Sequence, residues 1–290
     1  MKAGLIGHGI AASLTPAMHE AEGRALGLSY QYDLLDVSTE RFRNIPLSRI
    51  LDQAEADGYV GLNITHPFKV EVVEYLSELS EIARTIGAVN TVVFQGGRRF
   101  GFNTDYSGFL AAVQTVQPAL FLGQVLLLGA GGAGTAVALA LIDAGVNRIV
   151  IHDKTPGRGA ALVAQLSAAR PDASFAVVDR LVTMDLSQYD GVVNATPMGM
   201  NEHPGTAIDV AGLPETTWVA DIVYFPLETE LLVQAKKRGC QTINGTGMAI
   251  HQAVDAFSFI TGKQADPTRF MACIERLISQ KQIPDEELVP

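Results

Sequence analysis

The sequence predicts an α/β protein of two domains with parallel sheets. Three observations support this prediction. The chain has 290 residues, about twice the length of an ordinary domain. It is 48% hydrophobic and 18% charged, a composition that supports packed cores and excludes disorder for the bulk of the chain. Short apolar runs alternate with segments of helical periodicity, which is typical of parallel strands joined by helices.

Composition also excludes several classes of function. The 21 basic and 31 acidic side chains give a net charge of −10 without a basic run, so nucleic-acid binding is not expected. Cys240 and Cys273 are too few for a disulfide framework, and the histidines lack metal-ligand spacing, so we expect no metal. No apolar run approaches the ~20 residues of a membrane span, and the first residues do not resemble a signal peptide. We therefore expect a cytoplasmic protein.

The first hundred residues contain the pattern of an α/β domain. Strands are predicted at 4–7, 30–37 and 59–65. Helices are expected after Pro16 and after Pro67. The second of these carries apolar residues at helical spacing, namely Phe68, Val72, Tyr75, Leu76 and Leu79. A Gly-Gly pair then predicts a hairpin with strands at 91–94 and 99–102.

A second unit begins after one more helix and a connector near Gln117-Pro118. The continuous apolar run 125–128 predicts a buried parallel strand, followed by a glycine-rich turn and a helix. Further strands are expected at 148–153, 175–178, 191–194 and 218–224. Two helices close the chain, the second with Asp266 as N-cap and Pro267 as its first residue. The last residues are expected to fray.

The glycine-rich turn predicts a dinucleotide site. It reads Gly129, Ala130, Gly131, Gly132, Ala133 and Gly134. In this G-x-G-x-x-G pattern the first glycine makes a tight turn, the second lets the backbone approach a pyrophosphate, and the third lets helix and strand pack closely. The helix N-terminus adds N–H groups and partial positive charge. The alternative is a strand–helix turn that binds nothing.

Asp153 indicates which dinucleotide is bound. It closes the next predicted strand about 20 residues after the turn, where an acid hydrogen-bonds the adenosine ribose. A carboxylate there pairs with a 2′-hydroxyl and repels a 2′-phosphate, which favours NAD over NADP. Lys154 and Arg158 follow closely and would offset part of this repulsion, so NADP stays open as the less favoured cofactor.

Candidate catalytic residues follow predicted strands in the first half, where ligands gather in open α/β sheets. Lys69 would lie in the first turn of a helix, whose positive end disfavours the charged amine and suits a general acid/base. The alternative is a solvated surface lysine. Asp105 is a second candidate, with a helix N-cap as the alternative, and Asn90 is either a ligand or a turn former.

Together, these segments resemble the signatures of the shikimate/quinate dehydrogenase family. The matching segments are Ser13-Leu14-Thr15-Pro16, Asn63-Ile64-Thr65-His66-Pro67-Phe68-Lys69, Gly87-Ala88-Val89-Asn90-Thr91, Asn103-Thr104-Asp105, the Gly129 turn, Asn194-Ala195-Thr196-Pro197-Met198-Gly199-Met200, and Gly245 to Gln252. They occur in the family's order over nearly the whole chain. The resemblance implies a substrate-binding domain over 1–105, with about 245–290 returning to it, and a Rossmann-like NAD-binding domain over 106–244. It implies a monomer or a homodimer.

The resemblance also implies roles for individual residues. Lys69 matches the catalytic lysine and Asp105 its partner. Substrate-binding positions, which include these two, match Ser13, Thr15, Asn63, Thr65, Asn90, Tyr224 and Gln252. Cofactor-binding positions match the six turn residues together with Asp153, Lys154, Arg158, Thr196 and Gly245. The expected reaction is the NAD-dependent oxidation of the C3 hydroxyl of quinate or shikimate, a small polyhydroxylated ring acid, to 3-dehydroquinate or 3-dehydroshikimate.

Subfamily features favour a catabolic, NAD-dependent enzyme. The run Asp153-Lys154-Thr155 stands where biosynthetic members typically have Asn-Arg-Thr, and Thr15 resembles the actinobacterial quinate/shikimate dehydrogenases. Two alternatives stay open: an NADP-dependent biosynthetic shikimate dehydrogenase, and a non-catalytic dinucleotide-sensing homologue. Gly247 replaces an expected larger residue, which would give room beside the nicotinamide or loosen its loop, so an amino-substituted substrate also stays open.

Overall fold

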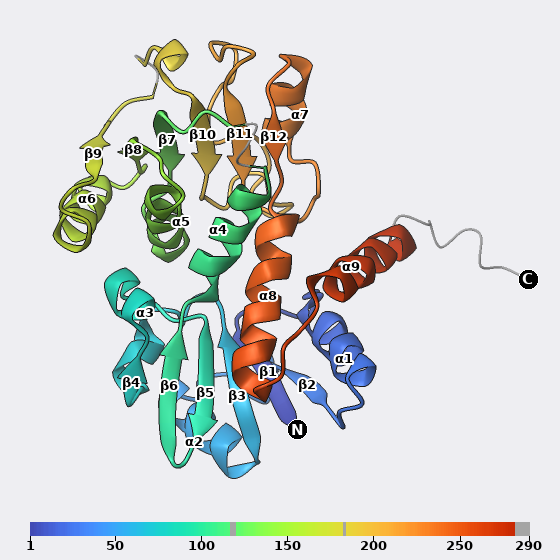
Figure 1. Cartoon of the computed structure of the whole chain (residues 1–290). Helices are drawn as coiled ribbons and strands as arrows, with labels where there is room; N and C mark the ends of the chain where they lie inside the picture. Colours follow the sequence, from blue (N-terminus) through green and yellow to red (C-terminus); the bar gives the residue numbers. More distant parts are fainter. Residues whose placement is uncertain (117–119, 182–183, 282–290) are drawn as a thin grey trace, which may run out of the picture. The chain divides into compact units, whose positions relative to one another are not determined.

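The computed structural model describes residues 1–116, 120–181 and 184–281 (Figure 1). The chain forms two compact units. The first contains Met1–Thr104 and the chain from Ala253 onward, and the second contains Asp105–Gln252. The expected connector near Gln117 and the expected frayed tail lie outside the described residues. Each unit has its own sheet, as the α/β prediction requires.

The first unit contains a mixed six-stranded sheet with the order β2-β1-β3-β5-β6-β4 (Figure 1). Its strands are β1 (Lys2–Gly7), β2 (Gln31–Asp36), β3 (Tyr59–Ile64), β4 (Glu78–Leu79), β5 (Thr91–Gln95) and β6 (Arg98–Phe102). β1 pairs in parallel with β2 and β3, whereas β5 is antiparallel to both β3 and β6. The carboxyl ends of β1, β3 and β6 therefore lie at the same sheet edge as the start of β5.

Helices cover this sheet and the connections between its strands. They are α1 (Thr15–Ala25), α2 (Leu47–Ala56), the 3-10 helix η1 (Glu71–Tyr75), α3 (Glu81–Ile86), α8 (Thr246–Thr261), which begins in the second unit, and α9 (Pro267–Lys281). The sequence prediction missed α2, although its buried residues Leu47, Ile50, Leu51 and Ala54 have helical spacing. α2 packs in one core with Ile6 and Leu62 of the sheet.

The helix predicted after Pro67 is wrong. Residues 66–70 form a turn, followed by η1 and then by the short strand β4. The apolar residues that suggested the helix do face the core: Val72 is fully buried, and Phe68, Tyr75, Leu76 and Leu79 pack against the same cluster. The pattern therefore reported burial correctly, but consecutive short elements bury these side chains instead of one α-helix.

The second unit contains six parallel strands in the order β12-β11-β10-β7-β8-β9. They are β7 (Gln124–Leu128), β8 (Arg148–His152), β9 (Ser174–Val177), β10 (Gly191–Asn194), β11 (Trp218–Asp221) and β12 (Thr242–Ile243). Helices α4 (Thr104–Val116), α5 (Gly132–Asp143), α6 (Arg158–Ala169) and α7 (Glu230–Lys237) accompany them, with the short 3-10 helix η3 (Leu186–Gln188). This is the strand order of doubly wound dinucleotide-binding folds, with the switch point between β7 and β10. The doubly wound prediction is therefore confirmed.

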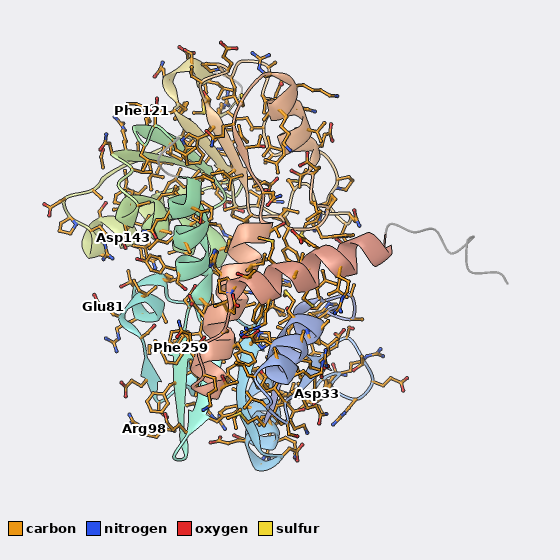
Figure 2. All side chains as sticks on the ribbon, turned by 45° about the vertical axis from the view of Figure 1, so that its right-hand side comes forward. Asp33, Glu81, Arg98, Phe121, Asp143 and Phe259 are labelled. Carbon is orange, nitrogen blue, oxygen red and sulfur yellow. The ribbon has the colours of Figure 1, made fainter. Side chains whose placement is uncertain are left out.

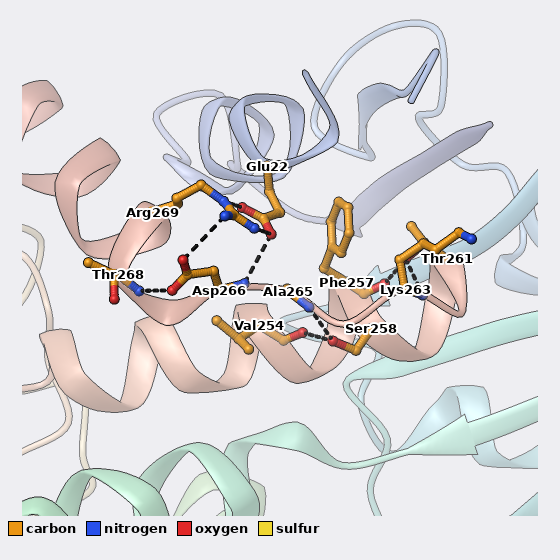
Figure 3. Close-up of polar contacts among 10 residues, drawn as sticks. All are labelled: Glu22, Val254, Phe257, Ser258, Thr261, Lys263, Ala265, Asp266, Thr268 and Arg269. Carbon is orange, nitrogen blue, oxygen red and sulfur yellow. Dashed lines mark hydrogen bonds and ion pairs between the residues drawn. The ribbon is translucent and has the colours of Figure 1, made fainter. Parts of the chain in front are cut away.

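A buried carboxylate joins the C-terminal helix α9 to α1 in the first unit (Figure 3). The side chain of Glu22 on α1 is 0% exposed. Arg269 donates from Nε to Glu22 Oε2 and from Nη2 to Oε1, each at 2.6 Å, and the backbone N–H of Asp266 donates to Oε1 at 3.0 Å. These bonds fix the start of α9 against α1, although the two helices lie far apart in the sequence.

Replacing Arg269 with alanine is expected to lower the free energy of unfolding, because it leaves the Glu22 carboxylate buried without its cation. Arg98→Ala is the matched control. Arg98 lies at the β5–β6 hairpin end of the first unit (Figure 2) and forms a half-exposed ion pair with Glu78 at 2.9 Å. Such exposed pairs contribute little. Urea denaturation should show a larger loss for Arg269→Ala, and equal losses would contradict the role of the Glu22 contact.

Candidate active site

Several predicted substrate residues of the first unit lie in loops at one edge of its sheet, where strands end or begin. Thr65 follows β3, and its N–H donates to Ile6 of β1 at 3.0 Å. Lys69 lies in the turn after Thr65, and its carbonyl accepts the N–H of Val89 at 2.7 Å. Asn90 precedes β5. Main-chain hydrogen bonds therefore hold the segments that carry Thr65, Lys69 and Asn90 to this edge.

The placement of Thr65 depends on a glycine that the sequence prediction did not single out. Gly7 ends β1, and a Cβ on Gly7 would lie 2.3 Å from Cγ2 of Thr65. It would also lie 3.2 Å from the carbonyl oxygen of His66. Any side chain at position 7 would displace Thr65, so the close packing of the two loops requires glycine here.

Asp36 holds the loop that leads to Ser13 and Thr15. Its carboxylate accepts the N–H groups of Gly9 and Ile10, each at 2.9 Å, and that of Ser38. Burial opposes ionisation of Asp36, but the hydrogen bonds from Ser38, Gly9 and Ile10 outweigh it and lower its pKa. The sequence prediction missed this residue.

The hydroxyls of Ser13 and Thr15 hydrogen-bond to each other. Ser13 Oγ donates to Thr15 Oγ1 at 3.1 Å and accepts the N–H of Thr15 at 3.3 Å. Hydroxyl side chains at the start of a helix can serve as helix caps. However, α1 has Leu14 at its N-cap position and no side-chain capping bond. The two hydroxyls therefore form a polar pair at the helix start.

Asn90 is tied to the start of α4. Its Oδ1 accepts the N–H of Thr104 at 2.8 Å, and its Nδ2 donates to Thr104 Oγ1 at 3.0 Å. Asn90 is 3% exposed, so it does more than shape a turn. Asp105 follows Thr104 and lies in the first turn of α4 rather than in front of it. The candidate acid is thus part of the helix that Asn90 anchors.

The predicted effect of a helix macrodipole on Lys69 is wrong. It required an α-helix beginning near Pro67, and the structure has a turn over residues 66–70 followed by η1. Lys69 is half-buried in this turn. The lysine keeps its position after a strand, but any activation must come from its surroundings at the site.

The glycine turn of the second unit has the geometry that a dinucleotide requires. Gly129 has a φ of +102°, which favours glycine. A Cβ on Gly134 would lie 2.1 Å from the carbonyl oxygen of Gly129, whereas a Cβ on Gly131 would meet nothing within 4 Å. The first and third glycines are therefore required by the turn and by packing, and the second leaves open space where a pyrophosphate approaches.

Asp153 ties this turn to the end of the neighbouring strand β8. Its Oδ2 accepts the N–H of Ala130 at 2.8 Å, and its Oδ1 accepts the N–H of Thr155 at 2.8 Å. Partial burial opposes ionisation, but these bonds and the charge of Arg158 outweigh it and lower the pKa of Asp153. The group is therefore an anion at neutral pH. Lys154 and Arg158 are both exposed.

A second loop meets the glycine turn at the switch point. A Cβ on Gly129 would lie 2.8 Å from the carbonyl oxygen of Ala195, which follows β10. Asn194 shapes this loop, because its Oδ1 accepts from both N and Oγ1 of Thr196. Asn194 Nδ2 in turn donates to Asp221 at 2.9 Å. The predicted cofactor residue Thr196 thus lies beside the glycine turn.

The remaining predicted residues of the second unit lie on two segments. Tyr224 follows β11 and is 45% exposed. A Cβ on Gly245 would lie 2.5 Å from the carbonyl oxygen of Ile222, so only glycine permits this approach. Gln252 lies on α8, where its Nε2 donates to the carbonyl of Ala249 at 3.1 Å.

Gly247 faces another helix. It lies in the first turn of α8, and a Cβ there would lie 3.1 Å from the Cβ of Ala112 on α4. One turn earlier on α4, a Cβ on Gly108 would lie 2.8 Å from the backbone nitrogen of Gln252. The small residue at 247 is therefore explained by the close packing of α4 and α8, rather than by a loosened loop.

Comparison with known proteins identifies the family. Residues 5–92 match the family model of the shikimate dehydrogenase substrate binding domain. A quinate/shikimate dehydrogenase (NAD(+)) of Corynebacterium efficiens is 47% identical, over 93% of this chain and 95% of the relative. The chain belongs to the shikimate/quinate dehydrogenase family. A shikimate dehydrogenase (NADP(+)) of Pseudarthrobacter chlorophenolicus is 44% identical, over 97% of this chain and 96% of that relative.

A solved member of the shikimate/quinate dehydrogenase family has the same fold. The structure of quinate dehydrogenase from Corynebacterium glutamicum in complex with NAD has a TM-score of 0.91 and 45% identity, and it covers 95% of this chain and 99% of that chain. The family resemblance and the fold class are thereby confirmed. Among the described residues no helix is long and apolar enough to cross a membrane, and no group of three His, Cys, Asp or Glu residues could hold a metal.

Asp221, which sequence reasoning missed, should make stability depend on pH. It is 2% exposed, and burial raises its pKa to about 6 against hydrogen bonds from Thr229, Val223 and Asn194. Because the folded protein binds this proton more tightly, the stabilisation is complete below the unfolded pKa of 3.8 and is lost as pH rises through about 6. The loss amounts to about 3 kcal/mol.

The measurement is urea denaturation between pH 4 and 8 on the wild type and on Asp221→Asn, which cannot titrate. The wild type should lose about 2.5 kcal/mol relative to the variant over this range, because pH 4 already lies above the unfolded pKa of 3.8. The difference between the two curves isolates Asp221 from the other carboxylates. Parallel curves would contradict a raised pKa at this position.

Proposed function

We propose that this protein is an NAD-dependent dehydrogenase that oxidises the C3 hydroxyl of quinate, shikimate or both. The observation that carries the proposal is the Asp153 carboxylate at the end of β8, hydrogen-bonded to the glycine turn of a doubly wound sheet. An anion there pairs with the ribose hydroxyls of NAD and repels a 2′-phosphate. Supporting it are the relative named for NAD(+) and the solved structure that contains NAD.

The proposed substrate is a ring acid with several hydroxyls, which needs many short polar partners. Its proposed ligands are Ser13, Thr15, Thr65, Lys69, Asn90, Asp105, Tyr224 and Gln252. We assign substrate binding to residues 1–105 with 245–290, and dinucleotide binding to 106–244. The combination of hydroxyl, amide and ammonium groups in this set suits a substrate that carries both hydroxyls and a carboxylate.

The proposed chemistry requires one proton acceptor at the carbinol. Lys69 takes the proton of the C3 hydroxyl, and Asp105 orients the hydroxyl and stabilises the ammonium group that results. NAD, when bound, accepts the hydride that leaves the same carbon. In the reverse direction, Lys69 returns the proton to the forming alcohol. The open space at Gly131 and the anion at Asp153 are the features of this chain that fit the cofactor.

A biosynthetic, NADP-dependent shikimate dehydrogenase is the second candidate. Two observations favour it: the 44% identical relative carries that name, and Lys154 and Arg158 are exposed cations next to Asp153. Under this alternative the protein reduces 3-dehydroshikimate. A non-catalytic homologue is less well supported, because both Lys69 and Asp105 are present.

Lys69→Ala tests the proposed chemistry. The wild type should reduce NAD⁺ with quinate or shikimate, followed by absorbance at 340 nm. Loss of a general base typically costs about 10²–10⁴-fold, so the variant should lose at least about a hundredfold in kcat while it still binds NAD⁺. Lys237→Ala, on the exposed surface of α7, is the control and should retain full activity. Full turnover by Lys69→Ala would exclude its acid/base role.

Asp153→Asn tests the choice of cofactor. Two like charges in contact cost several kcal/mol, and the substitution removes this repulsion between position 153 and the 2′-phosphate. The kcat/KM ratio of NADP⁺ to NAD⁺ should therefore rise at least about tenfold. NAD⁺ should also bind more weakly. Ala130 and Thr155 donate to different oxygens of the Asp153 carboxylate, and the substitution replaces one of these two acceptors with an –NH2 donor. An unchanged ratio would contradict the proposed role of Asp153. A wild type that prefers NADP⁺ would favour the biosynthetic alternative.

A further inference from the structure

We infer that Tyr32 is a positioning residue for the substrate site, acting through Asn63 and Thr91 on Asn90. The inference rests on the proposed function, in which Asn90 contacts the substrate. Tyr32 lies on β2, two strands away from β3, and is 4% exposed. Its hydroxyl reaches across the sheet and donates to Asn63 Oδ1 at 2.7 Å. Tyr32 is therefore not a ligand itself but the first member of a buried chain of hydrogen bonds.

The direction of this chain is fixed by one carbonyl group. Asn63 Nδ2 faces the main-chain oxygen of Asn90 at 3.3 Å, and a carbonyl can only accept. The other end of the Asn63 amide must then be its oxygen, so Tyr32 is the donor. Asn63 Nδ2 also donates to Thr91 Oγ1 at 3.0 Å. Both ends of the Asn63 amide thus serve protein groups, which gives this residue a supporting role rather than a ligand role.

Thr91 continues the chain of hydrogen bonds in the same donor-to-acceptor direction to Asn90. Its hydroxyl accepts from Asn63, so its hydrogen points to Asn90 Oδ1 at 3.1 Å. The N–H of Thr104 donates to the same oxygen at 2.8 Å. Two donors on Oδ1 hold the Asn90 amide with its nitrogen as the donor. A substrate group that meets Asn90 must therefore be an acceptor.

The Tyr32 ring is held rigidly, so its hydroxyl has little freedom. It packs in a core cluster with Ala3, Leu5 and Ile260. His19 on α1 lies against it with ring centroids 4.5 Å apart. His19 is neutral there, because complete burial lowers its pKa to about 3. Burial also raises the pKa of Tyr32, so its hydroxyl stays a neutral donor. The chain therefore connects a rigid core to the loop that carries Asn90.

Tyr59 provides a matched control in the same sheet. Its hydroxyl donates to Asp33 Oδ2 at 2.6 Å, and its side chain is 8% exposed. It belongs to a different core cluster from Tyr32 and makes no hydrogen bond to Asn63, Thr91 or Asn90 among the described residues. Tyr59→Phe and Tyr32→Phe each remove one tyrosine hydroxyl that donates a short hydrogen bond. Only the hydrogen bond that Tyr32→Phe removes belongs to the chain that leads to Asn90.

The experiment measures oxidation of quinate and shikimate at saturating NAD⁺ for the wild type, Tyr32→Phe and Tyr59→Phe. Tyr32→Phe should lower kcat/KM for the acid about tenfold, mainly through KM, with the KM for NAD⁺ unchanged. Thr91→Val interrupts the chain one step later and should give the same loss. Tyr59→Phe should match the wild type. Equal kcat/KM values for Tyr32→Phe and Tyr59→Phe would overturn the inference.

A double-mutant cycle with Asn90→Ala separates positioning from a general loss of stability. If Tyr32 acts through Asn90, adding Tyr32→Phe to Asn90→Ala should cost nothing further in kcat/KM. Multiplied losses would overturn the inference while the proposed function stands. Calorimetric titration with shikimate reads the same chain without turnover. A wild type that binds shikimate without oxidising it contradicts the proposed function alone, and a wild type that neither oxidises nor binds either acid overturns both.

Discussion

The site depends on acceptors for the N–H groups of loops that leave parallel strands. These N–H groups lie beyond the last hydrogen bond between the paired strands, so they need other acceptors. In both units a carboxylate at the end of the adjacent strand, or directly after it, accepts these N–H groups or fixes the loop. Asp36 is paired with Gly7 and holds the loop after β1, Asp153 holds the turn after β7, and Asp221 is paired with Asn194 and fixes the loop after β10.

Within each unit, these carboxylates hold the loops in place before any ligand binds. Asp36 and Asp153 have lowered pKa values because N–H groups surround them, so they remain anions at neutral pH. Asp221 is more deeply desolvated, and its raised pKa shows that burial outweighs its three hydrogen bonds. Close packing at glycines, such as that of Gly7 against Thr65, also holds these loops in place. Preorganised polar groups of this kind avoid the entropy cost of ordering loops when a ligand binds.

Local patterns predicted much of this site. The glycine turn and Asp153 lie within one strand–turn–helix–strand unit, so their spacing predicts their geometry. The segment after Pro67 was predicted wrongly, because apolar spacing reports which side chains are buried and does not distinguish one α-helix from a turn, a 3-10 helix and a strand. Tyr32, Asp36 and Asp221 were missed, because their partners are loops or strands that become neighbours only in the folded sheet.

The sequence by itself determined the two-domain α/β class, the doubly wound second unit, the family and the candidate residues, because each rests on short contiguous motifs. Only the tertiary structure decided that the first sheet is mixed and that Gly247 packs against Ala112. It alone aligned Tyr32, Asn63 and Asn90 in one chain of hydrogen bonds. These features depend on strand order and on contacts between distant segments, which local periodicity does not encode.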